Sequence, residues 1–289
     1  MNNVPLENLK NSQWMAATPS IDSMVLGELI LPGAHNSGVD KKATYAAPGI
    51  AHWAACQNNS FLEQLQNGAR ALDLRLEYDI DSRGVGTFWF QHSGIRSSRS
   101  LENLIMQLIR FLEANPDEFV LLDFHELVAG NSAFDHREFN RFLTVHLGPR
   151  VIPSSNRHLT LDQLKKESRV QRVWLAAARH PALDSAFFLP GIEHFWSGIG
   201  TTSVSELQAH IANVLRDPHF SSMPWSLSAT SYTIAMGPLD IKEHLDQWFN
   251  PDNSWVHSCS IINADFFEES RLVHHCRTAN IIRAQQRDK

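Results

Sequence analysis

The stretch LENLIMQLIRFLEANPDEFVLLDF, residues 101–124, contains a helix pattern followed directly by a strand pattern. In its first part, Leu101–Ala114, apolar residues recur at helical spacing and fall on one stripe. These residues are Leu104, Ile105, Leu108, Ile109 and Leu112. The second part, Phe119–Phe124, is a short apolar run of the kind that forms a buried strand of a parallel sheet. The stretch therefore predicts a helix and then a buried strand.

The same two patterns alternate along the rest of the chain. Further buried strands are predicted at Met24–Leu31, Ala69–Leu76, Thr87–Gln91, Val170–Ala177, Trp225–Leu227 and Ser260–Ala264. Further helices are predicted at His136–Leu147, Ser205–Leu215 after the cap Ser203, Leu239–Phe249 and Glu268–Ala284. No Gly/Ser linker or repeat interrupts the alternation. It predicts an α/β fold, a single distorted TIM-type (β/α) barrel with residues 1–289 as one catalytic domain, rather than two doubly wound halves.

Composition excludes several classes of protein. The 289 residues are 43% hydrophobic, which is enough for one large core. The net charge of −6, without a long Lys/Arg run, argues against a nucleic-acid partner. Cys56, Cys259 and Cys276 are too few for a disulfide scaffold and form no CxxC metal pair, although a disulfide among them stays open. Without an apolar stretch of ~20 residues or a signal-peptide pattern, we expect a soluble chain, and a monomer is the default.

Polar side chains stand where the predicted strands end, which is where α/β barrels carry their reactive groups. They are His35, Asn36, Asp73, Arg75, His92, Asp123, His125 and Asp265. Asp73 and Arg75 are two positions apart, so strand geometry points both to one face. The last strand of a closed barrel returns to the first, so we expect Asp265 to orient His35.

Each of these residues also has a purely structural interpretation. A histidine at a strand end is usually an ordinary loop residue, and Asp73 with Arg75 makes a reasonable structural ion pair. Asp123 and Asp265 are reasonable helix caps. Their occurrence together favours chemistry, because two histidines, an arginine and an orienting carboxylate suit phosphodiester cleavage. One neutral imidazole takes a proton, the protonated one gives a proton, and the guanidinium offsets charge on phosphate.

Four segments in order carry a family resemblance: LPGAHNSG (residues 31–38), GARALDLR (68–75), QHSG (91–94) and NPDEFVLLDF (115–124). They resemble the X region of phosphatidylinositol-specific phospholipases C. The likeness covers the first half of the chain from Trp14-Met15 and is weaker downstream, where Val173–Arg179, Ser226–Tyr232 and Ile261–Asp265 look like later strands. The resemblance implies a distorted TIM barrel that converts phosphatidylinositol to diacylglycerol and inositol 1,2-cyclic phosphate. It also favours a secreted protein.

The same resemblance implies roles for individual residues. His35 would deprotonate the inositol 2-hydroxyl, His92 would protonate the departing diacylglycerol oxygen, and Asp265 would hold His35. Arg75 matches an arginine that takes the place of calcium in metal-independent bacterial members. The candidates for substrate contact are Arg179, Tyr232 and His125, the last at a position where related enzymes have Glu or Lys.

The resemblance leaves the cofactor open because of Asn36. Calcium-using members carry Asn at this position, whereas metal-independent bacterial members carry Asp. Asn36, Asp73 and Asp123 offer the oxygen ligands that calcium prefers, with water and substrate completing ~6–8 positions. We therefore expect a Ca2+ site, and the alternative is no metal, with Arg75 in its place.

An insertion between His35 and Asp73 indicates contact with a membrane surface. Its segment Ala46–Trp53 is apolar and ends in a tryptophan, a residue that favours the membrane interface, so Trp53 is the predicted anchor. Trp196 and Trp225 also fall in predicted loops. The alternative is that these tryptophans pack over the barrel rim. The predicted partner is phosphatidylinositol in a membrane surface, contacted transiently.

Two other functions compete with this one. Another barrel phosphodiesterase, of the glycerophosphodiesterase or sphingomyelinase D type, would favour a His-Arg-Gly start and a Glu/Asp metal triad, and neither is evident. A catalytically silent inositol-lipid-binding module would have no need for both His35 and His92.

Overall fold

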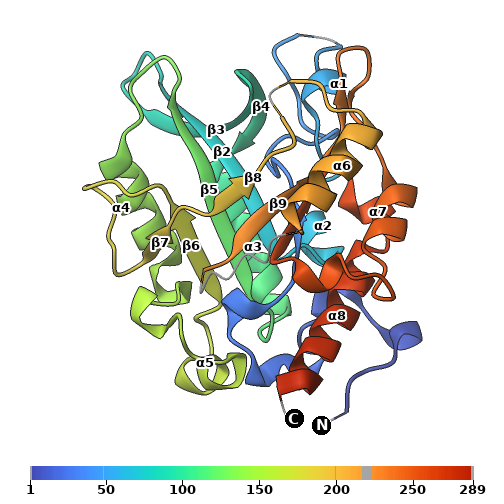
Figure 1. The fold of residues 1–289 in the computed structure, drawn as a ribbon. Coiled ribbons are helices and arrows are strands. Elements are labelled where there is room, and N and C mark those ends of the chain that lie inside the picture. Colours follow the sequence, from blue (N-terminus) through green and yellow to red (C-terminus); the bar gives the residue numbers. More distant parts are fainter. Residues whose placement is uncertain (1, 48, 199, 217–222, 288–289) are drawn as a thin grey trace.

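A mostly parallel sheet, curled into a half-barrel with helices around it, forms the centre of the protein (Figure 1). The computed structural model describes residues 2–47, 49–198, 200–216 and 223–287. The strand order in the main sheet is β7-β6-β5-β2-β1-β12-β9-β8, with β3 and β4 attached to β2. The α/β barrel prediction is therefore confirmed in its distorted form, because β7 and β8 lie at the two ends of this order.

The strands range in length from two to ten residues. Those of the main sheet are β1 Leu31–Ala34, β2 Ala71–Ile80, β3 Gly86–His92, β4 Ile95–Ser100, β5 Val120–Ala129, β6 Val173–Ala177, β7 Phe188–Pro190, β8 Glu193–Phe195, β9 Trp225–Ala229 and β12 Ile261–Ala264. A separate hairpin pairs β10 Tyr232–Thr233 with β11 Gly237–Pro238. The prediction of one domain over residues 1–289 stays a prediction.

The helices cover the outside of the sheet. They are α1 Ala51–Ala54, α2 Phe61–Gln66, α3 Leu101–Ala114, α4 His136–Leu147, α5 Leu161–Glu167, α6 Val204–Val214, α7 Lys242–Trp248 and α8 Leu272–Arg287. Short 3-10 turns lie at Leu6–Asn8, Asn11–Gln13, Pro19–Ser23, Leu26–Glu28, Gly148–Arg150, Ser154–Asn156, Val256–Ser258 and Phe267–Glu269. None of the helices in the described part of the chain has the length and apolarity needed to cross a membrane.

The helix and strand of residues 101–124 form as their sequence predicts. Ser100 begins α3 by accepting a hydrogen bond from the backbone N–H of Asn103, and the predicted apolar stripe packs into the core. At the other end, the Asn115 side chain donates to the Phe111 carbonyl at 2.9 Å. The run Phe119–Phe124 is buried throughout, and from Val120 onward it forms the first half of β5, which pairs with β2 and β6.

Several predicted elements begin later than expected, and three of them have a local cause. The strand predicted at Met24–Leu31 starts only at Leu31, because the Glu28 carboxylate accepts from the Val25 N–H at 3.0 Å and closes a 3-10 turn before it. Helix α8 starts at Leu272 rather than Glu268, since Phe266 adopts a left-handed backbone, φ 47°, and a 3-10 turn follows it. Helix α7 starts at Lys242, because Pro238 belongs to β11.

The strand that ends in His92 is antiparallel, not parallel as the barrel pattern implied. β2 and β5 run on past the barrel, and β3 returns along β2 before pairing with β4. β4 was not predicted, because its sequence IRSSRS is polar and only partly buried. His92, at the end of β3, is therefore placed by the antiparallel extension of the sheet formed by β3 and β4.

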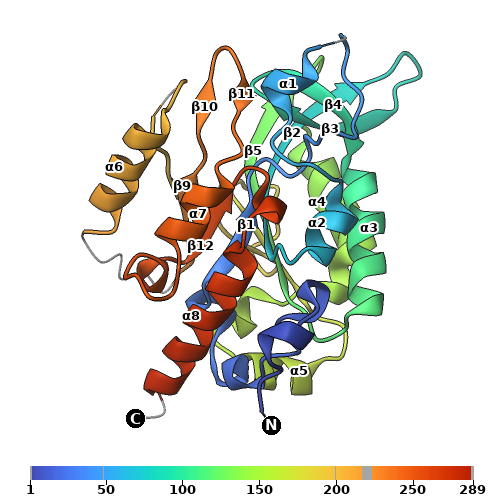
Figure 2. The same ribbon diagram turned by 90° about the vertical axis from the view of Figure 1, so that its right-hand side faces the viewer.

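The two ends of the barrel carry different elements, and a buried ion pair lies at the end near the chain termini. Figure 2 places α1 and the β10–β11 hairpin at one end and both chain termini at the other. At the terminal end the Arg70 guanidinium pairs with the Glu118 carboxylate, and both side chains are fully buried. Carbonyl oxygens of the N-terminal segment also accept from Arg70, so this ion pair fastens that segment to the sheet.

Candidate active site

The register of three neighbouring strands places His35 beside Asp265 and near Asp73. In β1, Ala34 lies opposite Ala264 of β12 and Leu72 of β2. The next residues, His35 and Asp265, therefore leave the sheet side by side, and the His35 N–H donates to the Ala264 carbonyl at 3.1 Å. All of these strands are parallel, so their C-terminal ends meet at one edge, as predicted for a barrel.

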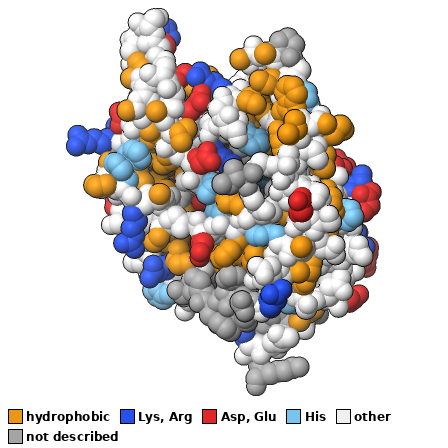
Figure 3. All heavy atoms as spheres, turned by 45° about the horizontal axis from the view of Figure 1, so that its top comes forward, with side chains coloured by type: hydrophobic (Ala, Val, Ile, Leu, Met, Phe, Trp, Pro, Cys, Tyr) orange, Lys and Arg blue, Asp and Glu red, His pale blue; other side chains and the backbone are white. Residues whose placement is uncertain are grey.

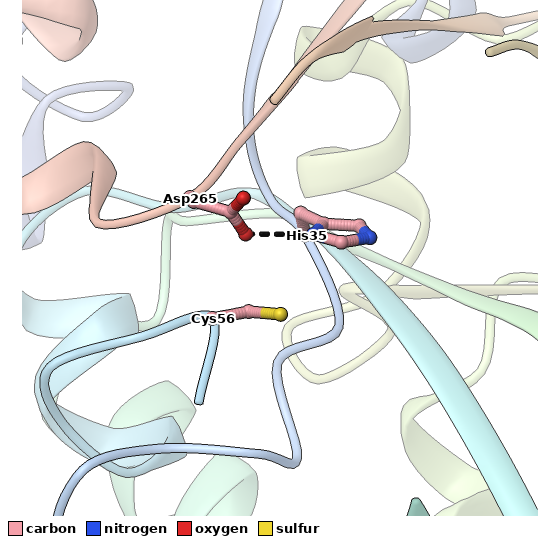
Figure 4. A group of neighbouring side chains, drawn as sticks. All are labelled: His35, Cys56 and Asp265. Carbon is pink, nitrogen blue, oxygen red and sulfur yellow. Dashed lines mark hydrogen bonds and ion pairs between the residues drawn. The ribbon is translucent and has the colours of Figure 1, made fainter. Parts of the chain in front are cut away.

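Both ring nitrogens of His35 have partners that fix its protonation. Nδ1 lies 2.7 Å from Asp265 Oδ1, and both side chains are buried (Figure 4). Because a carboxylate only accepts, Nδ1 donates to it. The Arg75 Nη2 donates to Nε2 at 3.0 Å, which requires a lone pair on Nε2. His35 is thus a neutral imidazole whose lone pair faces a guanidinium.

Asp73 and Arg75 form a buried ion pair beside His35. Arg75 Nε donates to Asp73 Oδ1 at 3.2 Å, and its Nη2 donates to Oδ2 at 2.9 Å. Oδ2 also accepts from the Asn36 N–H and from the Asn263 side chain, each at 3.2 Å. Burial alone would raise the pKa of Asp73, but the charge of Arg75 holds it well below its ordinary value. The carboxylate is therefore ionised and its oxygens are occupied.

His92 faces His35 across a gap. The two ring centroids are 6.0 Å apart and the planes are nearly perpendicular. His92 Nδ1 lies 2.9 Å from the Ala54 carbonyl oxygen, so it donates there and leaves Nε2 for other contacts. Burial lowers the pKa of His92, and repulsion lowers it further, both from the His35 ring whenever that ring is protonated and from the positive charge of Arg75.

Cys56 lies between the two histidines and was not predicted. Figure 4 shows its sulfur pointing to the side of the His35–Asp265 pair, and Sγ is 3.6 Å from His92 Nδ1. Burial and the neighbouring Asp265 carboxylate raise the pKa of the thiol well above its ordinary value, so it is not a nucleophile. All three cysteines are buried and free, so none forms a disulfide.

A second polar group crosses the barrel from β5 to β8. His194 Nε2 lies 2.6 Å from Asp123 Oδ2, and the rings of His194 and His125 are 3.9 Å apart. Trp196 stacks on His194 at 5.1 Å and also lies 5.0 Å from the Arg75 guanidinium. Sequence reasoning missed His194 because β8 has only three residues, too few for a readable alternation.

Two predicted substrate contacts lie outside these groups. Arg179 is exposed, two residues after β6, and lines a hollow of about 930 Å³ with residues such as His158 and Pro190. Tyr232 starts β10, where its backbone pairs with Thr202. Neither side chain is among the contacts of His35 described above, and contact with inositol stays a prediction for both.

The three predicted calcium ligands fit a calcium ion poorly. Both oxygens of Asp73 accept hydrogen bonds from Arg75, so its charge is already balanced. Asp123 is paired with His194. Asn36 Oδ1 and Asp123 Oδ1 are buried and have no hydrogen-bond partner among the described residues. Two such oxygens are still far from the ~6–8 that calcium takes.

Exposed apolar side chains lie at the same end of the barrel. In the predicted anchor segment Ala46–Trp53, Pro48 lies outside the described residues, and Trp53 belongs to α1. The Trp53 indole is 42% exposed and donates to the Ile234 carbonyl at 2.8 Å. Ile234 and Met236, in the β10–β11 hairpin, are 77% and 65% exposed. We call these three residues the apolar rim; Figure 3 shows hydrophobic side chains gathered at this end.

The other two tryptophans named with Trp53 are not exposed anchors. Trp225 starts β9 and is buried, which confirms the strand predicted at Trp225–Leu227 and excludes the loop position that was also considered for this residue. Its ring packs edge-to-face with Phe195. Trp196 follows β8 and packs against His35, with ring centroids 5.4 Å apart. It therefore belongs to the wall of the site.

Comparison by sequence finds relatives, although no family model matches the chain. The chain is 28% identical over 142 residues to a 1-phosphatidylinositol phosphodiesterase of Listeria monocytogenes, covering 47% of this chain and 39% of that protein. It is 31% identical over 142 residues to human PI-PLC X domain-containing protein 2, covering 41% and 45%. It is 25% identical over 313 residues to PI-PLC X domain-containing protein 3 of Danio rerio, covering 94% of each. The first two matches span less than half of those relatives.

Comparison by structure finds the same fold. The phosphatidylinositol-specific phospholipase C of Listeria monocytogenes superposes with a TM-score of 0.71 at 17% identity, over 94% of this chain and 99% of that one. The corresponding enzyme of Staphylococcus aureus gives a TM-score of 0.68 at 14% identity, over 94% and 98%.

Proposed function

The chain belongs to the family of phosphatidylinositol-specific phospholipase C X-domain proteins, and from this we propose that it cleaves phosphatidylinositol to diacylglycerol and inositol 1,2-cyclic phosphate. The observation that carries the proposal is the state of His35. It is a neutral imidazole held by Asp265 on one nitrogen, with Arg75 at the other and His92 opposite. That arrangement is a general base beside a phosphate-binding cation and a second histidine.

In the first step His35 activates the inositol 2-hydroxyl. Nε2 takes the hydroxyl proton while the oxygen attacks phosphorus and forms the new O–P bond. Asp265 accepts the Nδ1–H bond and stabilises the imidazolium that results. Because Arg75 lies 3.0 Å from Nε2, a phosphate bound to the guanidinium brings the neighbouring hydroxyl to the base.

His92 completes the step as the general acid. The bond from phosphorus to the diacylglycerol oxygen breaks as His92 Nε2 gives that oxygen a proton. The hydrogen bond from Nδ1 to the Ala54 carbonyl fixes the orientation of the ring. The lowered pKa of His92 makes its protonated form a stronger acid, which suits protonation of a leaving alkoxide. The products are diacylglycerol and the cyclic phosphate.

Arg75 supplies the positive charge in this mechanism. The contacts with Asp73 and His35 use Nε and Nη2, so the two N–H groups of Nη1 would bind phosphate and offset the charge that develops on its oxygens. Its ion pair with Asp73 holds it in place, because this carboxylate accepts from both Nε and Nη2. A requirement for calcium stays a prediction, and the contacts of Asp73 support the alternative in which Arg75 takes its place.

The apolar rim gives the enzyme its contact with lipid. Trp53 belongs to α1, and Ile234 and Met236 lie in the neighbouring β10–β11 hairpin, at the end of the barrel opposite the chain termini, so a membrane touched by them would face the end at which we place the site. The contact is peripheral and transient, and the substrate headgroup enters from the bilayer surface. A monomeric state and a secreted location remain predictions.

Phosphatidylinositol vesicles test the proposal. We expect wild-type protein to release diacylglycerol in excess chelator, and His35→Ala and His92→Ala to lose turnover. Loss of activity in chelator that calcium restores would refute the role given to Arg75. No turnover by folded wild-type protein would favour the silent lipid-binding module, and wild-type turnover by both variants would refute the mechanism.

A further inference from the structure

The group formed by Asp123, His125 and His194 is not used in the mechanism above. Asp123 and His125 both belong to β5, whose pairing with β2 shifts register at His125, and their ligand atoms converge with that of His194. His194 comes from β8, which lies at the far end of the sheet order and is not a hydrogen-bonded neighbour of β5. The three side chains therefore meet across the inside of the barrel, held there by strands rather than by loops.

The donor atoms of this group converge. One ligand atom from each of the three residues lies within 4.8 Å of the other two. Asp123 Oδ2 and His194 Nε2 are already 2.6 Å apart. Zinc bonds of about 2.0–2.2 Å in a tetrahedron place two ligand atoms about 3.4 Å apart. The distance between Asp123 Oδ2 and His194 Nε2 has to increase by roughly 0.8 Å for a metal ion to take the place of the hydrogen-bonding proton between them.

An independent feature of Asp123 points to a missing partner. Its second oxygen, Oδ1, is buried and has no hydrogen-bond partner among the described residues. The whole residue is only 3% exposed, so water does not satisfy this atom from outside. A buried carboxylate oxygen without a partner is costly, and a cation removes that cost.

We infer that Asp123, His125 and His194 bind a divalent transition-metal ion of the zinc type. Two imidazoles and one carboxylate are the ligand set of such ions, whereas calcium takes oxygen ligands almost entirely. The site differs from the predicted calcium site, with which it shares only Asp123.

The ion would cross-link two strands on opposite sides of the open barrel. It would join β5 to β8, and the next residue but one after His194 is Trp196, which packs on His35 and Arg75. The metal would thus fix one wall of the active site without touching the reacting atoms. Binding does not depend on the proposed function and is measured without lipid.

A second group competes for soft metals and has to be distinguished. His35, Cys56 and Asp265 also place one ligand atom each within 4.8 Å of one another. The absorption spectrum of bound Co²⁺ shows which of the two groups holds the ion. A thiolate ligand adds a sulfur-to-cobalt charge-transfer band, whereas a site of nitrogen and oxygen ligands gives visible d–d bands alone.

The test is titration of untagged, metal-free full-length protein with Zn²⁺ by calorimetry and with Co²⁺ by absorption. We expect one ion per chain, d–d bands without the thiolate band, and a raised melting temperature. His194→Ala and His125→Phe should each weaken zinc binding by about 100-fold or more, since even outer-shell partners contribute about 10–100-fold. Asp123→Asn gives a third variant in case one of these does not fold.

Two control variants complete the test. Cys56→Ser should bind zinc as wild type does. His180→Ala should also be unchanged, because it removes a histidine stacked on His136 at 3.7 Å outside the group. The inference is overturned if wild-type protein binds no zinc, if folded His194→Ala binds it unchanged, or if the cobalt complex shows a thiolate band that Cys56→Ser removes.

Discussion

Replacing Asp265 by asparagine tests how much of catalysis depends on one carboxylate. Asparagine keeps an oxygen that can accept from His35 Nδ1, so the 2.7 Å contact survives while the charge is lost. The carboxylate attracts the imidazolium by about 4 kcal/mol, taking a charge separation of about 4 Å and an effective dielectric constant of about 20. Since about 1.4 kcal/mol corresponds to tenfold in rate, kcat should fall by about a thousandfold.

The assay is diacylglycerol release from phosphatidylinositol vesicles, with circular dichroism to show that the variant is folded. Asp246→Asn is the matched control, because Asp246 Oδ1 lies 3.7 Å from His275 Nε2 in another His–Asp pair, between α7 and α8. It should leave kcat unchanged. If folded Asp265→Asn turns over substrate at the wild-type rate, Asp265 does not stabilise a charged His35, and the role given to both residues is wrong.

Three further predictions follow from the structure. Burial lowers the pKa of His92 below its ordinary value of 6.5, so kcat/KM should fall as the pH rises through that lowered value; an alkaline limb above 6.5 would exclude His92 as the acid. Glu118→Gln leaves the fully buried Arg70 unpaired and should lower the free energy of unfolding in urea by about 3–5 kcal/mol. The exposed Glu113→Gln should cost less than about 1 kcal/mol, and an equal loss in both variants would contradict this. The double variant with both Trp53→Ala and Ile234→Ala removes two side chains of the apolar rim and should weaken binding to phosphatidylinositol vesicles by about tenfold or more. Met106→Ala, which changes a 56% exposed apolar residue on α3, should not weaken binding, and an equal loss with Met106→Ala would refute the apolar rim.

The parts of the fold that the sequence predicts are those with a strong period. The stripe of α3 and the apolar run of β5 determine one helix and one strand because each pattern is long and regular. The strand expected before Leu31 failed because the Glu28 carboxylate closes a local turn, a side-chain effect that apolar composition does not reveal. β7 and β8 are three residues each, so no period exists to be read.

The contacts of the candidate site also fall into those that the sequence predicts and those that it does not. The contact between His35 and Asp265 was predicted, because a closed barrel brings the last strand beside the first. Their catalytic roles stay predictions. His194 and Cys56 were missed because no sequence spacing links them to their partners, Asp123 and His92, which lie 71 and 36 residues away. Contacts of this kind come from tertiary packing alone.

The most direct test of the proposed chemistry is to identify the first phosphorus-containing product by phosphorus NMR. Wild-type protein is incubated with phosphatidylinositol vesicles, beside His35→Ala as the control without the base. Attack by the 2-hydroxyl predicts inositol 1,2-cyclic phosphate as the first product, together with diacylglycerol, and its absence with His35→Ala. Formation of phosphatidic acid and free inositol, or of acyclic inositol phosphate with no cyclic precursor, would contradict the mechanism.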